Sequence, residues 1–233
     1  KVSFKSLLIF ASIGLLIAFH WLAFFKAIKV SNVSITLAMM STGAFFTSFL
    51  EPIFFKRKII NYEVLFGLIV IVGLYIIFRV ESTHLTGILF ALLSSFLGAL
   101  FSIFNGMIVK KHNATLISFY ELLFGVVFVT IFIFSTDGFS PSFFDLSNLD
   151  WIYIILLASI CTAYAFIAAV HIMKWISPYT LMLTTNMEPV YGILLALIIL
   201  GDKEYMHPTF YLGALIILMT VIVNGIIKTR KKD

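Results

Sequence analysis

The chain contains eight apolar runs, each about as long as a helix that crosses a lipid bilayer. They cover about residues 4–25, 33–55, 63–79, 86–108, 115–135, 151–173, 179–200 and 208–227. Roughly 20 apolar residues in a helix span a hydrocarbon core of about 30 Å. Inside lipid, the backbone polar groups of such a run must be satisfied within the run itself, which a helix achieves. The sequence therefore predicts an all-α fold, a polytopic membrane helical bundle.

Composition agrees with this fold class and excludes others. Hydrophobic residues make up 61% of the chain and charged residues 12%, well outside the range of ordinary soluble domains. The net charge of +5 is spread over loops and one tail, so we expect lipid and no nucleic acid as a partner. The single cysteine, Cys161, lies in an apolar run, which excludes a disulfide framework or a cysteine metal site within this sequence.

The basic residues are distributed unevenly between the two predicted sides of the membrane. Most of the 16 fall on the side that holds both chain ends, and the other side holds Lys26, Lys29, Arg79 and Lys203. Cytoplasmic loops carry an excess of Lys and Arg, so both ends of this chain are predicted to be cytoplasmic. The loop near residues 135–150 has acidic residues and no basic ones, which predicts an external position. We expect a location in the inner (plasma) membrane of a bacterium.

An internal repeat relates the two parts of the chain. A shift of 146 residues places Ala23 on Ala169, and it likewise pairs residues 31 and 177, 37 and 183, 67 and 213, and 76 and 222. The first three runs thereby match the last three, and the period is five helices. An odd period inverts one copy relative to the other, as in many transporters. We predict two inverted repeats, a first at 1–79 that lacks its first two helices and a second at 80–233, within a ten-helix protein.

Glu188 is the strongest candidate for a functional residue. It lies about nine residues into the run 179–200, near the membrane midplane, where a carboxylate is costly unless it faces protein or water. Pro189 follows it and weakens the helix at that point. Helical spacing places Thr184, Thr185 and Tyr191 on the same face, together with Gly192. We predict a substrate site at a broken helix, and the alternative is a structural kink.

Several other polar residues are weaker candidates. Asn186 beside Glu188 and Tyr164 in the run 151–173 are further predicted substrate-binding residues, and Glu188, Glu121 and His171 are candidates for proton coupling. The structural alternative for Glu121 is snorkelling or pairing with Lys110 or Lys111.

Two further interpretations concern packing. The stripe Ser94, Gly98, Ser102 and Asn105 predicts close helix packing, with Asn105 able to hydrogen-bond across helices. Glu51 precedes Lys56 and Arg57 by a few residues, which predicts a solvated ion pair at the membrane interface.

Enzyme signatures are absent from the sequence. It has no His-Glu-x-x-His, no Gly-x-Ser-x-Gly and no glycine-rich phosphate loop. The loops are also too short for a catalytic or nucleotide-binding domain. We therefore expect no enzymatic activity, no metal and no cofactor.

A set of short motifs runs through the second half of the chain: Tyr164-Ala165 through Ala168-Ala169, Ser177-Pro178, Asn186-Met187-Glu188-Pro189-Val190, Leu200-Gly201-Asp202 and Gly213. This set resembles the second repeat of EamA transporters of the drug/metabolite transporter superfamily. The family usually has Glu where this chain has Asp202, and the first repeat has Asn32 and Gly43 where the second has Pro178 and Pro189. The resemblance implies ten helices in two inverted repeats and secondary transport of small organic solutes, commonly export.

Two function classes remain from the sequence. The first is a secondary transporter, a permease or exporter working by alternating access between the two repeats, with a small organic solute as partner and a homodimer as a further option. The second is a membrane scaffold in which the buried acids only fix helix packing. The inverted repeat and the Glu-Pro motif favour the transporter.

The predicted topology can be tested with single cysteines in a background where Cys161 is replaced by Ser. Cysteines placed at residues 137–150 are expected to react with a membrane-impermeant maleimide from outside. Cysteines at residues 110–113 are expected to react only after the membrane is opened. Labelling of both loops from one side would contradict both the topology and the inverted repeat.

Overall fold

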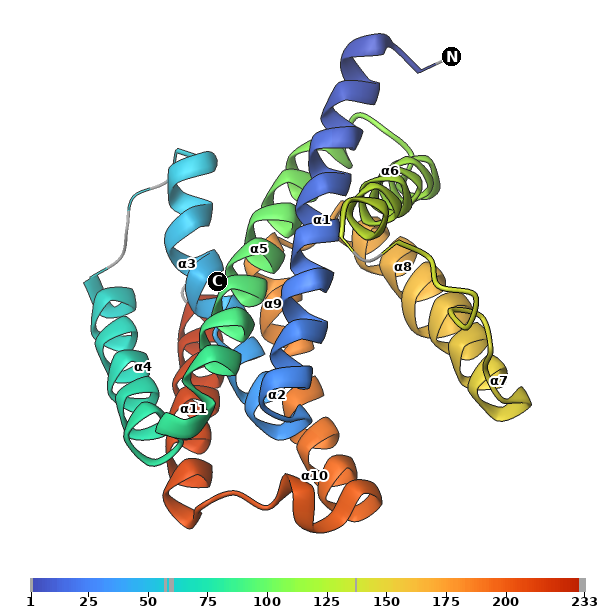
Figure 1. Ribbon diagram of the computed structural model, residues 1–233. Helices are drawn as coiled ribbons and strands as arrows, with labels where there is room; N and C mark the ends of the chain where they lie inside the picture. The colour runs from blue at the N-terminus through green and yellow to red at the C-terminus, as the bar shows by residue number, and fades with distance from the viewer. Residues whose placement is uncertain (1, 57, 59–60, 137, 231–233) are drawn as a thin grey trace. The chain divides into compact units, whose positions relative to one another are not determined.

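A computed structural model describes residues 2–56, 58, 61–136 and 138–230 (Figure 1). Over these residues the chain is helical and contains no strand. Lys1, Arg57 and Asp137, which entered the charge analysis, lie outside the described residues, as does the tail 231–233. The α-helices are α1 (Phe4–Val30), α2 (Val33–Met40), α3 (Gly43–Phe54), α4 (Asn61–Val80), α5 (Leu85–Ile108), α6 (Ala114–Ser135), α7 (Asn148–Leu156), α8 (Ala165–Ile172), α9 (Pro178–Thr185), α10 (Glu188–Leu200) and α11 (Pro208–Arg230).

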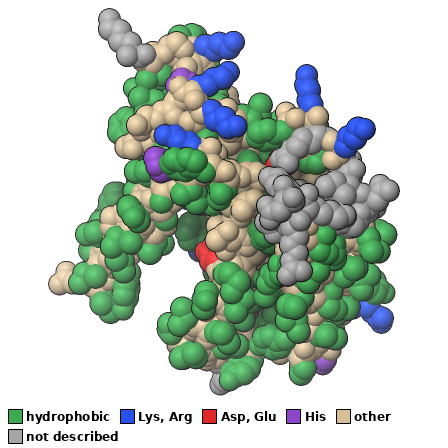
Figure 2. Space-filling view, turned by 180° about the vertical axis from the view of Figure 1, so that it is seen from behind, with side chains coloured by type: hydrophobic (Ala, Val, Ile, Leu, Met, Phe, Trp, Pro, Cys, Tyr) green, Lys and Arg blue, Asp and Glu red, His purple; other side chains and the backbone are tan. Residues whose placement is uncertain are grey.

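The helices agree with the predicted membrane spans. Among the described residues, seven helical stretches are long and apolar enough to cross a membrane. The remaining predicted run, 63–79, corresponds to α4, in which the apolar part Leu65–Val80 is shorter. Hydrophobic side chains cover much of the surface seen in Figure 2, as contact with lipid requires. The prediction of an all-α, multi-pass membrane fold is confirmed.

Two of the spans are each built from two short helices. In the span Val33–Phe54 the break between α2 and α3 falls at Ser41 and Thr42, whose hydroxyls bond to carbonyl oxygens of the preceding turn. Such local bonds compete with a continuous helix. In the span Pro178–Leu200 the break falls at Asn186–Met187. Pro189 lies in the first turn of α10. Backbone N–H groups there have no partner within the helix, so the missing N–H of proline costs no hydrogen bond.

The chain divides into two compact units. Unit 1 holds Lys1–Ala18 and Phe104–Ile176, and unit 2 holds Phe19–Ile103 and Ser177–Asp233. The long helices α1 and α5 contribute to both. This division follows spatial contacts, whereas the boundary at residue 79 follows an internal similarity, so the repeat remains a prediction.

Unit 1 gathers α6, α7 and α8 with the ends of α1 and α5. Gly14 of α1 lies against the backbone of α6, where an added Cβ would come within 2.7 Å of the Glu121 carbonyl oxygen. Lys110, Lys111 and Lys174 line one surface pocket. Within this unit they share one end of the helices, as the charge analysis predicted.

In unit 2 the two broken spans contact each other, and α4 contacts α11. Helix α2 packs against α10, α3 against α9, and α4 against α11. The α4–α11 contact centres on two glycines: a Cβ at Gly73 would lie 3.0 Å from the Gly213 carbonyl oxygen, and one at Gly213 would lie 3.0 Å from that of Gly73. Small residues allow this close approach of two helices. The contacts between the two broken spans are reciprocal, α2 with α10 and α3 with α9.

Two buried carboxylates cap the amino ends of the broken spans. Glu204, just after α10, accepts hydrogen bonds from the backbone N–H groups of Val33 (3.1 Å) and Ser34 (2.8 Å) at the start of α2. Glu51 in α3 accepts one from the N–H of Tyr179 at the start of α9 (3.0 Å). The predicted solvated position of Glu51 is therefore wrong: its side chain is fully buried, because it serves a helix end inside the unit. These caps orient α2 opposite to α10 and α3 opposite to α9.

The glycine contact predicts opposite effects for two similar substitutions. Gly213→Ala places a methyl group 2.7 Å from Ile77 and 3.0 Å from the backbone of Gly73, so we expect a loss of about 1–3 kcal/mol of stability. Gly125→Ala meets only the Gly14 carbonyl oxygen at 3.6 Å, so the better helix propensity of Ala should leave it neutral or up to about 1 kcal/mol more stable. Thermal unfolding of both purified variants in detergent measures the difference, and equal midpoints would contradict this packing.

Candidate functional site at the two helix breaks

The breaks in the two spans contact each other within unit 2. The Asn186 side chain at the α9–α10 break donates from Nδ2 to the carbonyl oxygen of Ser41 at the α2–α3 break, at 3.1 Å. Asn186 is 3% exposed. Its amide thus satisfies a carbonyl group that the interrupted helix leaves without its usual partner. Asn186, predicted to bind substrate, holds the two breaks together.

Helix α5 adds hydroxyl groups to the same region. Ser95 Oγ lies 3.1 Å from Thr42 Oγ1 and donates to the Met40 carbonyl oxygen at 3.2 Å. Thr42 and Ser95 are both fully buried. Both were missed by the sequence reasoning, although the 146-residue shift that aligns the repeats places Thr42 opposite Glu188. The polar centre of unit 2 is therefore closed by hydrogen bonds among its own groups.

The other predicted residues of the second break are exposed. Thr184, Thr185, Glu188 and Tyr191 all present surface, and Tyr191 is 61% exposed. The two threonine hydroxyls donate to carbonyl oxygens of α9, which leaves their oxygens free to accept a hydrogen bond. Gly192, predicted for the same face, instead lies against Leu37 of α2.

Glu188 is the first residue of α10. The amino end of a helix carries a partial positive charge, which favours a carboxylate in the first turn. Unlike the buried caps Glu51 and Glu204, the Glu188 side chain is exposed. A carboxylate, two hydroxyl oxygens and an aromatic ring are thus each exposed on the two sides of this helix break.

Unit 1 holds the remaining predicted site residues, and they differ in burial. Tyr164 ends a π-helical segment, Leu157–Tyr164, and is 70% exposed. His171 is exposed and its ring lies edge-on to that of Trp175, with centroids 5.0 Å apart. No sequence signal indicated the π-helical segment, which the periodicity analysis treated as α-helix.

Glu121 has a different environment from the one predicted. Its side chain is fully buried and accepts a hydrogen bond from Asn105 Nδ2 at 3.0 Å. Snorkelling to the interface, or pairing there with Lys110 or Lys111, is therefore wrong, because the side chain points into the unit. Asn105 makes the hydrogen bond across helices that its place in the polar stripe suggested.

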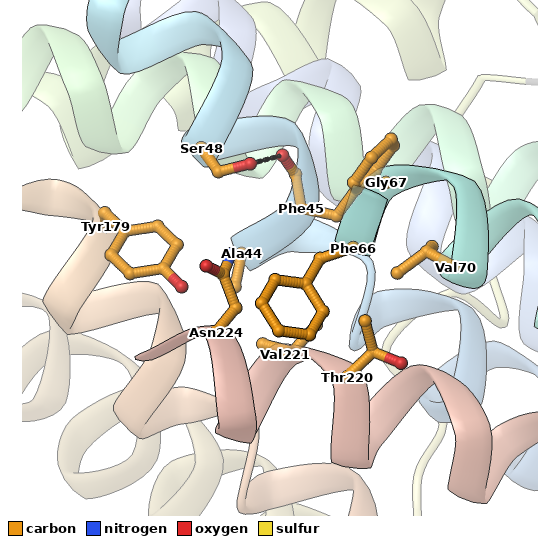
Figure 3. Close-up of a pocket in the computed structure, with 10 residues that line it drawn as sticks. All are labelled: Ala44, Phe45, Ser48, Phe66, Gly67, Val70, Tyr179, Thr220, Val221 and Asn224. Atoms are coloured by element: carbon orange, nitrogen blue, oxygen red, sulfur yellow. Dashed lines mark hydrogen bonds between the residues drawn. The ribbon is translucent and has the colours of Figure 1, made fainter. Parts of the chain in front are cut away.

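A small cavity lies between α3, α4, α9 and α11 in unit 2 (Figure 3). Its walls carry mainly apolar groups together with Ser48, Tyr179, Thr220 and Asn224. It has room for about one water molecule, and Asn224 Oδ1 has no hydrogen-bond partner among the described residues. The cavity suits an ordered water and is too small for an organic solute.

Apolar helices of membrane-spanning length, two of them broken at their centres, define a multi-pass membrane protein of the kind seen among secondary transporters. The model of the EamA-like transporter family matches residues 85–226, more than half of the chain. The protein belongs to this family, which confirms the resemblance in its motifs.

Solved structures share the fold. Significant matches number 17 chains. One of them, titled only "Crystal structure of protein", has a TM-score of 0.68 and 13% sequence identity, over 100% of this chain and 80% of the other. At that identity the match shows the fold alone. No curated protein matches the chain.

The contact between the two breaks predicts a stability difference between neighbouring substitutions. Asn186→Leu keeps the side chain's approximate size but leaves the Ser41 carbonyl oxygen buried without a partner, which should cost about 1–3 kcal/mol. Thr184→Val removes only a hydroxyl that is exposed and bonded within α9, so its effect should stay within about 0.5 kcal/mol. Chemical unfolding in mixed micelles measures both, and an unaffected Asn186→Leu protein would show that the contact is dispensable.

Proposed function

We propose that this protein is a secondary transporter of small organic solutes, working by alternating access between two inverted repeats. The observation that carries the proposal is the pair of broken spans joined by Asn186 and Ser41. Transporters of several folds bind substrate where discontinuous helices meet near the midplane, since helix ends provide polar groups there. The reciprocal contacts between the two broken spans of unit 2 support the proposal that the two repeats move relative to each other.

The chemistry of the exposed face indicates the substrate class. Glu188 offers a negative charge, Thr184 and Thr185 offer acceptor oxygens, and Tyr191 offers an aromatic surface. A protonated amine would bind the carboxylate, and an apolar or aromatic portion would lie on the ring. We therefore propose amphipathic or weakly polar amines and metabolites, rather than bare inorganic ions. Asn186 acts by positioning α10, and Tyr164 is a further proposed substrate-binding residue.

The proposal also covers the membrane, the orientation of the chain, the direction of transport and the oligomeric state. The protein is placed in the inner membrane of a bacterium with both ends of this chain cytoplasmic, and export is the proposed direction. It acts as a permease without catalytic chemistry. A homodimer is a further proposal. If the protein is instead a membrane scaffold, no solute flux is expected. A flux measurement therefore decides between the transporter and the scaffold.

The test is flux through proteoliposomes loaded with a panel of radiolabelled amino acids, polyamines and aromatic amines. For any solute that the wild-type protein moves, Glu188→Gln should weaken apparent affinity by about tenfold to a hundredfold, since it removes a charge-assisted contact. The matched control is Asp145→Asn, which removes an acid in an exposed loop and should transport normally. Unchanged flux and affinity in Glu188→Gln would exclude this residue, and absence of flux for the whole panel would favour the scaffold.

A further inference from the structure

Glu121 is a fully buried acid that the proposed substrate site does not use. It lies in α6, whose backbone at this point is in close contact with Gly14 of α1, and Asn105 of α5 faces it. Asn105 and Ser118 are also fully buried. Glu121 is thus fully buried, with α1 against its backbone and Asn105 of α5 against its side chain.

Glu121 and Asn105 share one hydrogen bond, and each side chain also has an oxygen without a partner among the described residues. Asn105 Nδ2 donates to Glu121 Oε2 at 3.0 Å. The second polar atom of each side chain, Oε1 of Glu121 and Oδ1 of Asn105, has no hydrogen-bond partner among the described residues. Both are acceptors, and buried acceptors without donors are costly. The two unpartnered oxygens belong to the two side chains that already share one bond.

The surrounding charges do not neutralise a carboxylate at this position. The titratable or cationic groups of unit 1 on or beside the helices around Glu121 include Lys5, Lys110, Lys111, His112, Tyr120, His171 and Lys174. Lys5 lines a groove between α1 and α5, and Lys110, Lys111, His112 and Lys174 line the pocket at the helix ends. Tyr120 stacks on Phe10, and His171 lies against Trp175. In the described part of the chain no ion pair to Glu121 is formed, and an isolated buried charge is strongly unfavourable.

We propose that Glu121 and Asn105 form a proton-binding site. A proton on Oε1 converts the carboxylate into a neutral acid, and that O–H donates to Asn105 Oδ1 while Asn105 Nδ2 donates to Oε2. One proton from solution thereby satisfies both unpartnered oxygens and removes the buried charge. The resulting cyclic acid–amide pair has two parallel hydrogen bonds between the same two side chains.

Ser118 offers an alternative partner for the ionised form. It lies three residues before Glu121 on α6, a spacing that places both side chains on one face of the helix. Its hydroxyl is buried and has no hydrogen-bond partner among the described residues. When the proton leaves, this hydroxyl can donate to the carboxylate in place of the acid's own O–H. The site thus has one set of hydrogen bonds for each protonation state.

This inference rests on the proposed function for its role in transport. The sequence offered three candidates for proton coupling, and the structure separates them: Glu188 and His171 are exposed, whereas Glu121 is enclosed with the partner that a bound proton requires. An enclosed proton is exchanged only when the helices of unit 1 rearrange. Proton binding at Glu121 would therefore be coupled to a conformational step, as secondary transport needs.

Infrared spectroscopy of the full chain in liposomes tests the site without any solute. We expect a C=O stretching band of a protonated, hydrogen-bonded carboxylic acid that shifts on slow exchange into D₂O. The band should be lost in Glu121→Gln and kept in the control Asp145→Asn. In Asn105→Ala it should move to higher frequency, because the acid loses its partner. Gln keeps an N–H donor toward Asn105, so Glu121→Gln should fold.

The outcomes decide the proposal in each case. A band that persists in folded Glu121→Gln, or an unshifted band in Asn105→Ala, would overturn the proton site. Should Glu121→Gln fail to fold, the Asn105→Ala shift decides. Coupling is read separately with any solute that the flux panel identifies: Glu121→Gln should keep exchange of labelled for unlabelled solute and lose stimulation by a pH gradient. A panel without flux would count against the transporter, and the infrared result would still decide the site.

Discussion

The need to satisfy every backbone polar group inside hydrocarbon governs this structure. Two spans are interrupted at their centres, and each interruption would leave carbonyl and N–H groups without partners. Asn186 supplies a donor to Ser41 at the crossing, and the carboxylates of Glu204 and Glu51 accept from the first N–H groups of the opposing spans. Each broken span thus receives polar partners from the other, at its amino end and at its break.

Burial divides the acids of the chain into distinct roles. Glu51 and Glu204 are buried against helix amino ends and accept hydrogen bonds from the backbone N–H groups there. Glu121 is buried beside an amide and two unpartnered oxygens, an environment suited to a neutral acid. Glu188 starts a helix and is exposed, and it is the residue proposed to contact a solute. The same side chain thus serves as a structural cap, a proposed proton carrier or a proposed ligand, according to what surrounds it.

The apolar runs, and the proline and charged residues within or between them, predicted much of this architecture. The apolar runs located the helices, and Pro189 beside Glu188 indicated the break in the span 179–200. The matching break at Ser41–Thr42 contains no proline and was not predicted. The predicted environments of Glu51 and Glu121 were wrong because charge spacing along one helix says nothing about which partner another helix brings. The functional roles assigned to Glu188, Thr184, Thr185 and Tyr191 remain predictions.

The sequence by itself determined the class of protein, the positions of its helices and the family, since these depend on local apolar runs and short motifs. The tertiary structure decided which polar groups are satisfied, because hydrogen bonds such as those of Asn186 with Ser41 and Asn105 with Glu121 join residues on different helices. Burial is set in the same way, by the neighbours that packing supplies. A pattern along one chain segment identifies a polar residue in a membrane, and only its partners show whether it caps a helix, holds a proton or faces a solute.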